Sequence, residues 1–131
     1  MPGPDLRIRV GVDVVGVERV GRLAAEHAAR LDSVFTPAEL DYCRGKRRRD
    51  EHLAARFAAK EAVLKAIGTG IRRRMSWTDV EVVKGLHGRP GVRLHGEVAA
   101  EAHRKGIAAI DLSISHSAGL AVAGAIAVSG S

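Results

Sequence analysis

The sequence predicts an α+β fold: one small domain, residues 1–131, in which a mostly antiparallel sheet packs against a long central helix. The chain has 131 residues, which is the usual size of one domain. Segments near both ends alternate between apolar and polar side chains, as strands do, whereas residues 50–67 repeat with the period of a helix. Helices and strands do not alternate strictly, which favours an antiparallel sheet over a parallel one.

The N-terminal part is expected to form a strand and then a helix. Residues 8–14 alternate in the pattern of a half-buried strand. We expect its apolar face to be buried and Asp13 to point away from that face. A helical pattern follows from Val17 to about Arg30. The apolar side chains of the strand are Ile8, Val10, Val12 and Val14.

The middle of the chain should form two further helices. The motif Thr36-Pro37-Ala38-Glu39 combines a capping residue, a proline at the first helical position and a glutamate three residues after the cap, so a short helix should run to about Arg44. A longer helix should begin at residue 50 or 51 and end before Gly68. Lys60 lies within its apolar stripe, so either its stem is buried with the amine reaching water, or this edge faces a phosphate-filled cleft.

The following segment is expected to add a short strand pair and a helix. Trp77 and residues 80–84 have the composition of a strand, and residues 85–90 that of a turn. A short extended piece should follow near Val92. Residues 97–105 carry acidic side chains early and basic ones late, which indicates a helix.

The last two strands should pair as a hairpin. Residues 110–114 alternate between apolar and polar side chains, and residues 120–128 form the longest apolar stretch of the chain. The turn between them is expected at residues 116–119.

The net charge of +6 predicts an anionic partner. Basic runs at residues 46–49 and 72–74 are either solvated loops or anion-binding segments. The main alternative to an enzyme is therefore a basic, non-catalytic module that binds nucleic acid. Aromatic residues make up only 3% of the chain, which argues against a platform for stacking bases, so we expect no nucleic acid.

Location and redox state follow from what the sequence lacks. Its longest apolar stretch is much shorter than the roughly 20 residues that cross a bilayer, and no secretory signal pattern is present, so we expect a cytoplasmic protein without a membrane partner. The single Cys43 should be a free thiol on a helix.

Several residues could carry chemistry, each with a plainer alternative. Asp13 and Glu61 could together hold Mg²⁺, which binds through one or two carboxylates plus phosphates; alternatively, Glu61 forms a surface salt bridge with Lys65, four residues later. The segment Gly68-Thr69-Gly70 is either a helix cap or a backbone approach to a ligand. His116 is either a structural turn residue or a donor to phosphate.

Three segments taken together resemble the signature blocks of the holo-acyl-carrier-protein synthases, a family of 4′-phosphopantetheinyl transferases. They are GVDVV at residues 11–15 with Arg19, RFAAKEA at residues 56–62 continuing into KAIGTG at residues 65–70, and LSISHS at residues 112–117. Their order and spacing agree with the family over nearly the whole chain.

The resemblance implies the 4′-phosphopantetheinyl transferase fold and a homotrimer with an active site between neighbouring subunits. It also implies Mg²⁺-dependent transfer of the 4′-phosphopantetheine group from coenzyme A to a serine of an apo acyl carrier protein, with release of 3′,5′-ADP. The product would serve fatty acid or polyketide biosynthesis.

The resemblance also assigns roles to residues. Asp13 and Glu61 would hold Mg²⁺, and Lys65 would contact the phosphates and neutralise charge on the leaving group. Glu61 or a metal-associated water would take the proton of the carrier serine. The coenzyme would be bound by Arg56, Lys65, Gly68, Thr69, Gly70 and His116, and the carrier protein by Arg19 and Arg22.

Overall fold

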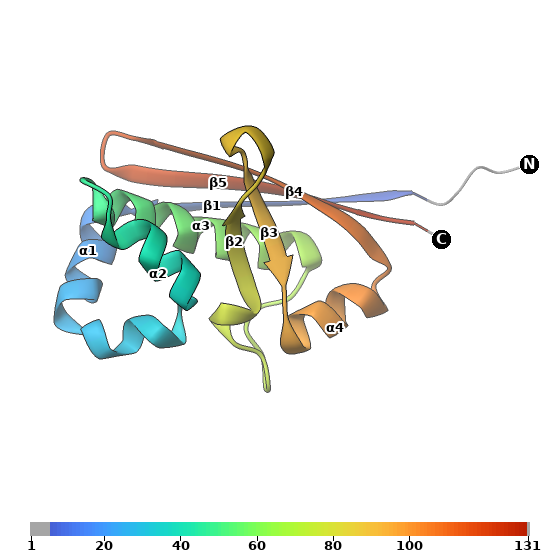
Figure 1. Cartoon of the computed structure of the whole chain (residues 1–131). Helices are drawn as coiled ribbons and strands as arrows, with labels where there is room; N and C mark the ends of the chain where they lie inside the picture. The colour runs from blue at the N-terminus through green and yellow to red at the C-terminus, as the bar shows by residue number, and fades with distance from the viewer. Residues whose placement is uncertain (1–5, 131) are drawn as a thin grey trace, which may run out of the picture.

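The structure is a computed structural model that describes residues 6–130. Three antiparallel strands form its main sheet in the order β1-β5-β4. They are β1 (Arg7–Gly16), β5 (Leu120–Ser129) and β4 (Ile107–Ser117). The longest helix, α3 (Arg49–Ile67), runs along one face of this sheet (Figure 1). The predicted α+β fold, with an antiparallel sheet against a long helix, is confirmed.

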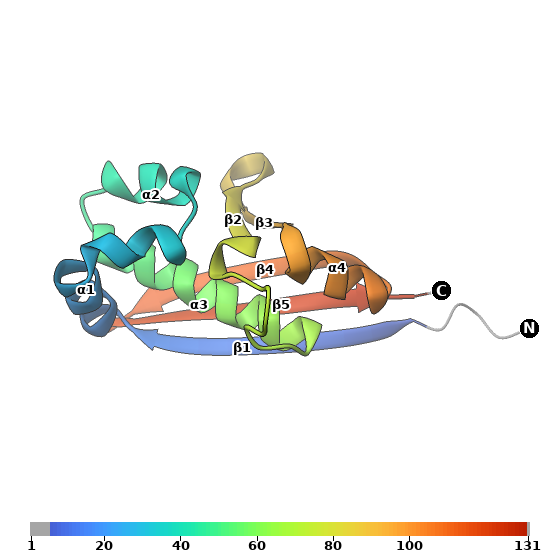
Figure 2. The ribbon, with the colours of Figure 1, turned by 90° about the horizontal axis from the view of Figure 1, so that it is seen from below.

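The remaining elements lie on the same side of the sheet as α3 (Figure 2). Helices α1 and α2 stand near one end of α3, and α4 and the separate β2–β3 ribbon stand further along it. None of the helices within residues 6–130 combines the length and the apolar character that a bilayer span requires. The bounds of these elements are α1 (Val17–Glu26), α2 (Pro37–Arg44), β2 (Val80–Lys84), β3 (Pro90–Leu94) and α4 (Gly96–Arg104).

Local capping bonds fix where two of the elements begin. The predicted capping box is present, because Thr36 Oγ1 accepts from the Glu39 N–H at 3.2 Å and Glu39 Oε1 accepts from the Thr36 N–H at 2.8 Å. The prediction of a strand at Trp77 is wrong. Ser76 Oγ accepts from the Thr78 N–H at 3.3 Å, and this side-chain bond holds residues 77–79 in a 3₁₀ turn ahead of β2.

Two predicted boundaries shift. The first helix ends at Glu26 rather than near Arg30, because the backbone tightens into a 3₁₀ turn over Ala28–Ser33 that leads Phe35 into the core. The hairpin turn is shorter than predicted. Only Ala118 and Gly119 lie outside the strands, with φ of 53° and 77°, as a two-residue turn of the favoured hairpin type requires.

The prediction that the apolar face of β1 is buried is wrong for the single chain. Ile8, Val10, Val12 and Val14 are 54–68% exposed, and they alternate with Gly11, which faces α3, so they lie on the opposite face of the sheet. Asp13 does point away from them, but toward α3. The alternation of apolar and polar side chains correctly predicted a strand. The expectation that its apolar face packs against the core of the same chain was wrong.

Small residues explain why the opposite face receives α3. Alternate positions of β5 on this face are buried alanines, which leave the helix free to approach the sheet closely. A β-carbon on Gly11 would collide with the carbonyl oxygen of Ala62 in α3, so the close approach requires glycine there. The buried alanines are Ala121, Ala123, Ala125 and Ala127.

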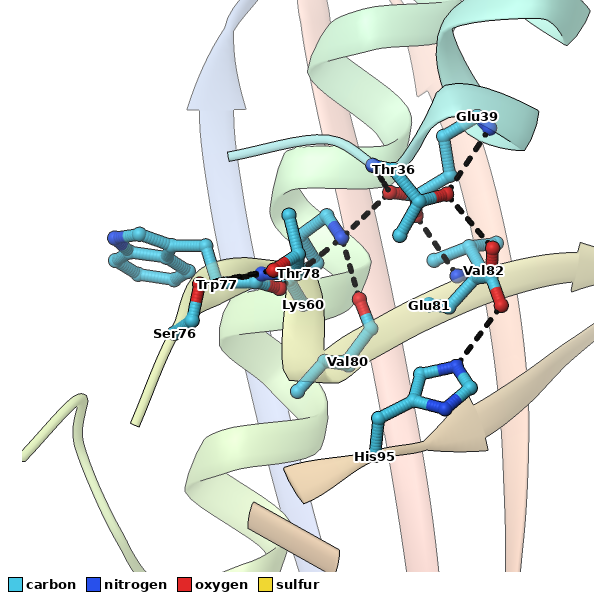
Figure 3. Close-up of polar contacts among 10 residues, drawn as sticks. All are labelled: Thr36, Glu39, Lys60, Ser76, Trp77, Thr78, Val80, Glu81, Val82 and His95. Atoms are coloured by element: carbon cyan, nitrogen blue, oxygen red, sulfur yellow. Dashed lines mark hydrogen bonds and ion pairs between the residues drawn. The ribbon is translucent and has the colours of Figure 1, made fainter. Parts of the chain in front are cut away.

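Both interpretations of Lys60 are wrong, because its side chain is fully buried and paired. Its ammonium group contacts Glu39 Oε1 at 2.7 Å and donates to the carbonyl oxygens of Trp77, at 3.2 Å, and Val80 (Figure 3). Burial lowers the pKa of Lys60, and the Glu39 carboxylate opposes that shift. The lysine therefore joins α2, α3 and β2 inside the core and faces no cleft.

Candidate active site

The first cluster of the site lies between β1 and α3. Asp13 is on the inward face of β1, opposite Ala123 of β5, and so faces α3 across a close sheet–helix contact. Asp13 and Glu61 line one pocket of about 340 Å³, together with Arg19 of α1. The structure therefore brings together the two carboxylates that the sequence proposed as a pair. The other lining residues are Val14, Val15, Gly16, Val20, Leu23 and Phe57.

The two carboxylates of this pocket, which we call the acid pocket, are unevenly neutralised. Lys65 Nζ lies 3.1 Å from Asp13 Oδ1 and donates to the carbonyl oxygen of Val12 at 3.0 Å. Burial raises the pKa of Glu61, the negative charge of Asp13 raises it further, and Lys65 lowers it. The predicted alternative, a salt bridge between Glu61 and Lys65, is replaced by the pair of Lys65 with Asp13. Glu61 thus stands beside a like charge that a cation would relieve.

The chemistry of these donors suits magnesium. Within residues 6–130 no group of three or more His, Cys, Asp or Glu side chains gathers as a self-sufficient metal centre. Mg²⁺ does not require one, since it is commonly held by one or two carboxylates, water and substrate phosphates. Asp13 and Glu61 supply two carboxylates at one pocket, and Lys65 adds a positive charge for phosphate.

The second cluster contains Arg56 and His116. They line a separate pocket of about 160 Å³ together with Tyr42, His52 and Lys84. Arg56 is only 8% exposed, and its Nε atom has no hydrogen-bond partner. Burial lowers the pKa of His52, and the charges of Arg56, Lys46 and His116 lower it further. A buried, unsatisfied cation among other cations is an arrangement that favours an anionic ligand.

His116 has a carboxylate beside it. Its Nδ1 lies 3.5 Å from Glu51 Oε2, at the first turn of α3. His116 continues β4 rather than starting the hairpin turn, which directs its ring to the helix side of the sheet. The sequence identified the residue and not its partner, because the two are far apart along the chain.

The acid pocket and the Arg56 pocket share no lining residue. Arg56 and Glu61 are five positions apart on α3, which turns them by roughly 140° around the helix axis. Within one chain, the residues proposed from the sequence thus form two separate clusters on either side of α3.

The segment Gly68-Thr69-Gly70 leaves the end of α3 and is held by Lys105, which directly follows α4. Gly68 has φ +88° at the helix C-cap, where glycine is favoured. Lys105 Nζ donates to the carbonyl oxygens of Ile67 at 2.8 Å and Gly68 at 3.2 Å. These contacts support the helix-cap alternative.

One residue of the second basic run is bound within the chain. Arg72 donates to Thr69 Oγ1 at 3.0 Å and to Glu101 Oε2 at 2.6 Å. Sequence reasoning missed both Glu101 and Lys105, because nothing in the composition of residues 96–105 indicates which distant loop they contact.

Helix α1 presents the basic residues proposed for the carrier protein. Arg19 lines the acid pocket, and Arg22 is exposed on the same helix. An apolar pocket of about 210 Å³ adjoins the acid pocket and shares Val20, Leu23 and Phe57 with it. Leu23 is 49% exposed. The rim of the acid pocket is therefore basic on one side and apolar on the other.

Comparisons with known proteins agree on one family. The model of the 4′-phosphopantetheinyl transferase superfamily matches residues 9–121. The chain is 49% identical over 120 residues to a holo-[acyl-carrier-protein] synthase of Desulforudis audaxviator, covering 91% of both chains. It is 46% identical over 114 residues to one of Geobacter sulfurreducens, covering 86% of this chain and 90% of the relative.

A solved structure extends the likeness to the fold. The crystal structure of a holo-(acyl-carrier-protein) synthase from Bacillus anthracis, in complex with coenzyme A (3′,5′-ADP), is similar with a TM-score of 0.75 at 31% identity. The match covers 92% of this chain and 96% of that one.

Proposed function

Because the chain belongs to the 4′-phosphopantetheinyl transferase superfamily, we propose that the acid pocket is the centre of that reaction. The chain transfers the 4′-phosphopantetheine group of coenzyme A to a serine of an apo acyl carrier protein and releases 3′,5′-ADP. The observation that carries the proposal is the cluster of Asp13, Glu61 and Lys65 at one pocket. Membership of this transferase family argues against the alternative, a non-catalytic module that binds nucleic acid.

Asp13 and Glu61 are proposed to hold Mg²⁺. Two carboxylates at one pocket, one of them with its pKa raised by burial and by the other's charge, form a donor set that a divalent cation stabilises. When bound, the ion would supply positive charge to the pyrophosphate oxygens of coenzyme A and order them for attack.

Residues of the chain would then neutralise the charge on the leaving group and accept the proton of the serine. Transfer forms a bond from the serine oxygen to the phosphorus that bears the pantetheine, and breaks the bond from that phosphorus to the leaving 3′,5′-ADP. Lys65, half-exposed beside Asp13, is placed to neutralise the negative charge that develops on the departing phosphate. Glu61, or a water associated with the metal ion, is proposed to take the serine proton.

Arg56 and His116 are proposed to bind the nucleotide end of coenzyme A. The unsatisfied Nε of Arg56 and the surrounding cations suit the phosphate groups of that end. Lys65 and the segment Gly68-Thr69-Gly70 would lie against the same molecule nearer to the reacting phosphate. Arg19 and Arg22, at the rim of the acid pocket, would meet acidic side chains of the carrier protein.

A homotrimer is proposed to complete each site. Arg56 and Glu61 serve different pockets of one chain, so one coenzyme molecule would reach both clusters if the Arg56 cluster of a neighbouring subunit faced the acid pocket. The exposed apolar face of β1 supports association, since Ile8 and Val10 are more than 60% exposed and need a partner to be buried. The cytoplasmic location and the biosynthetic pathway stay predictions.

The reaction is tested by the intact mass of an apo acyl carrier protein after incubation with this chain, coenzyme A and Mg²⁺. A gain of about 340 Da, the mass of the phosphopantetheine arm, should require the ion. The gain should disappear in an Asp13→Ala, Glu61→Ala variant that still unfolds cooperatively. No gain with any of several carriers would refute the function, and a full gain with the double variant would refute the carboxylate roles.

The shared site is tested by mixing two inactive variants, Asp13→Ala and Arg56→Gln. If each site takes its acid pocket from one subunit and its arginine from the next, random trimers contain intact sites at about a quarter of positions, and activity should return to that level. Sites contained within one chain would give no recovery.

A further inference from the structure

The buried guanidinium of Arg56 must be held in place by contacts within the chain before its proposed ligand binds. Within residues 6–130 no carboxylate lies within ion-pair distance of Arg56, and its Nε has no hydrogen-bond partner. Buried cations are normally paired with an acid, as Lys60 is with Glu39 one helical turn further along α3. Arg56 departs from that rule.

An aromatic ring takes the place of the acid. The guanidinium carbon of Arg56 lies 3.9 Å from the centroid of the Tyr42 ring, which comes from α2. His52 meets the same ring edge-on, with centroids 5.6 Å apart and planes at 77°. This T-shaped contact restrains the ring, and the ring in turn restrains the guanidinium. Lys46 adds a second cation 4.5 Å from the ring centroid.

The kind of partner matters for an anion site. A carboxylate would hold Arg56 but would also cancel its charge and occupy its N–H donors. The face of an aromatic ring attracts a guanidinium through its quadrupole and accepts none of the in-plane donors. The cation therefore stays in one orientation with its charge and its donors available to phosphate.

We propose that Tyr42 is a positioning residue for coenzyme binding, which holds Arg56 in its phosphate-binding orientation without neutralising it. The inference rests on the proposed role of Arg56. Two residues of α2, three positions apart, then each contact a cation of α3. Its Glu39 neutralises Lys60 in the core, and its Tyr42 orients Arg56, four residues before Lys60, at the edge of a pocket.

The test is calorimetric titration of the full chain with coenzyme A, comparing substitutions at position 42. Tyr42→Phe keeps the ring and should bind within about two-fold of the wild type. Tyr42→Leu should raise the Kd by about five- to thirty-fold, the range expected for a desolvated cation–ring contact. The kcat for transfer at saturating coenzyme should change far less than the KM for coenzyme A, because Tyr42 touches no reacting atom.

A series of progressively fluorinated phenylalanines at position 42 separates ring electronics from packing. Fluorination weakens the negative face of the ring and hardly changes its shape, so the Kd should rise steadily along the series. This series remains informative if Tyr42→Leu fails to fold. A constant Kd along the series would overturn the inference.

Arg56→Gln supplies the matched background. If Tyr42 acts through Arg56, Tyr42→Leu should cause no further loss of coenzyme affinity in the Arg56→Gln chain. An equal loss in both backgrounds would overturn the inference, as would wild-type affinity in Arg56→Gln alone, because there would be nothing to position. A wild-type chain that neither binds coenzyme A nor modifies a carrier would refute the proposed function itself.

Discussion

Replacing Lys60 by methionine should destabilise the chain more than any change at the exposed cations. Methionine keeps most of the length of the side chain and removes only its charge and donors. Glu39, 1% exposed, would then be a buried carboxylate that has lost its cation but keeps two backbone donors, which places the cost near the lower end for a broken buried pair, about 3 kcal/mol. Losing the donor to the Trp77 and Val80 carbonyls adds about 1 kcal/mol each, for about 5 kcal/mol in all.

Urea unfolding of the two variants Lys60→Met and Lys65→Met provides the measurement and its control. Lys65 also pairs with an aspartate, but its side chain is 52% exposed, so its removal should cost less than about 1 kcal/mol of unfolding free energy. A loss of about 5 kcal/mol is a large part of the roughly 5–15 kcal/mol by which domains are stable. Equal losses for the two lysines would refute the reasoning from burial.

The double variant Glu39→Leu, Lys60→Met tests why the pair is present. Replacing a buried ion pair by apolar residues is often neutral or stabilising, because desolvation offsets the attraction. Here the pair also satisfies four backbone groups, so the double variant should remain at least about 2 kcal/mol less stable than the wild type. Wild-type stability of the double variant would contradict this explanation. The four groups are the N–H of Thr36 and Val82 and the C=O of Trp77 and Val80.

Three further predictions concern the site and the sheet. The folded-state pKa of Glu61 is raised, so the stability that its carboxyl group contributes is complete at low pH and is lost as the pH rises through that pKa. Glu61→Gln should therefore raise the melting temperature at neutral pH, although it should abolish transfer. Thermal unfolding between about pH 4 and 8 measures this effect. Replacing Arg19 and Arg22 by alanine should raise the KM for the carrier, less so at high salt, and leave the Kd for coenzyme A unchanged, as titration and steady-state kinetics would show. Val12→Asp on the uncovered sheet face should dissociate the proposed homotrimer, measured by sedimentation, whereas Val12→Ala should not.

Much of the fold could be predicted because its signals are local. The capping box at Thr36 and the helical period of α3 involve residues a few positions apart, and both were confirmed. The buried face of β1 was not predictable in this way, since alternation shows that a strand has two different faces but not which one its own chain covers. The alanines at alternate positions of β5 and Gly11 in β1 carried that information, because only small residues let a helix approach so closely.

The sequence predicted which residues belong to the candidate site, but not how they are arranged in space. The motif RFAAKEA places Arg56, Lys60 and Glu61 within six positions, and neither their charge nor their proximity in sequence shows which of them is structural. Their partners come from distant elements: a carboxylate for Lys60, an aromatic ring for Arg56 and a like charge for Glu61.

These partners separate structural charge from functional charge on one helix. Lys60 is matched by an opposite charge, so its electric field is cancelled inside the core and it can act on no ligand. Arg56 is held by a group that leaves its charge intact, and Glu61 stands beside Asp13, which increases the negative potential of the acid pocket. Both uncompensated charges destabilise the free chain, and phosphate and a divalent cation are the ligands that would relieve them. The free energy that folding loses at these two positions is therefore available for binding the proposed ligands, coenzyme A and Mg²⁺.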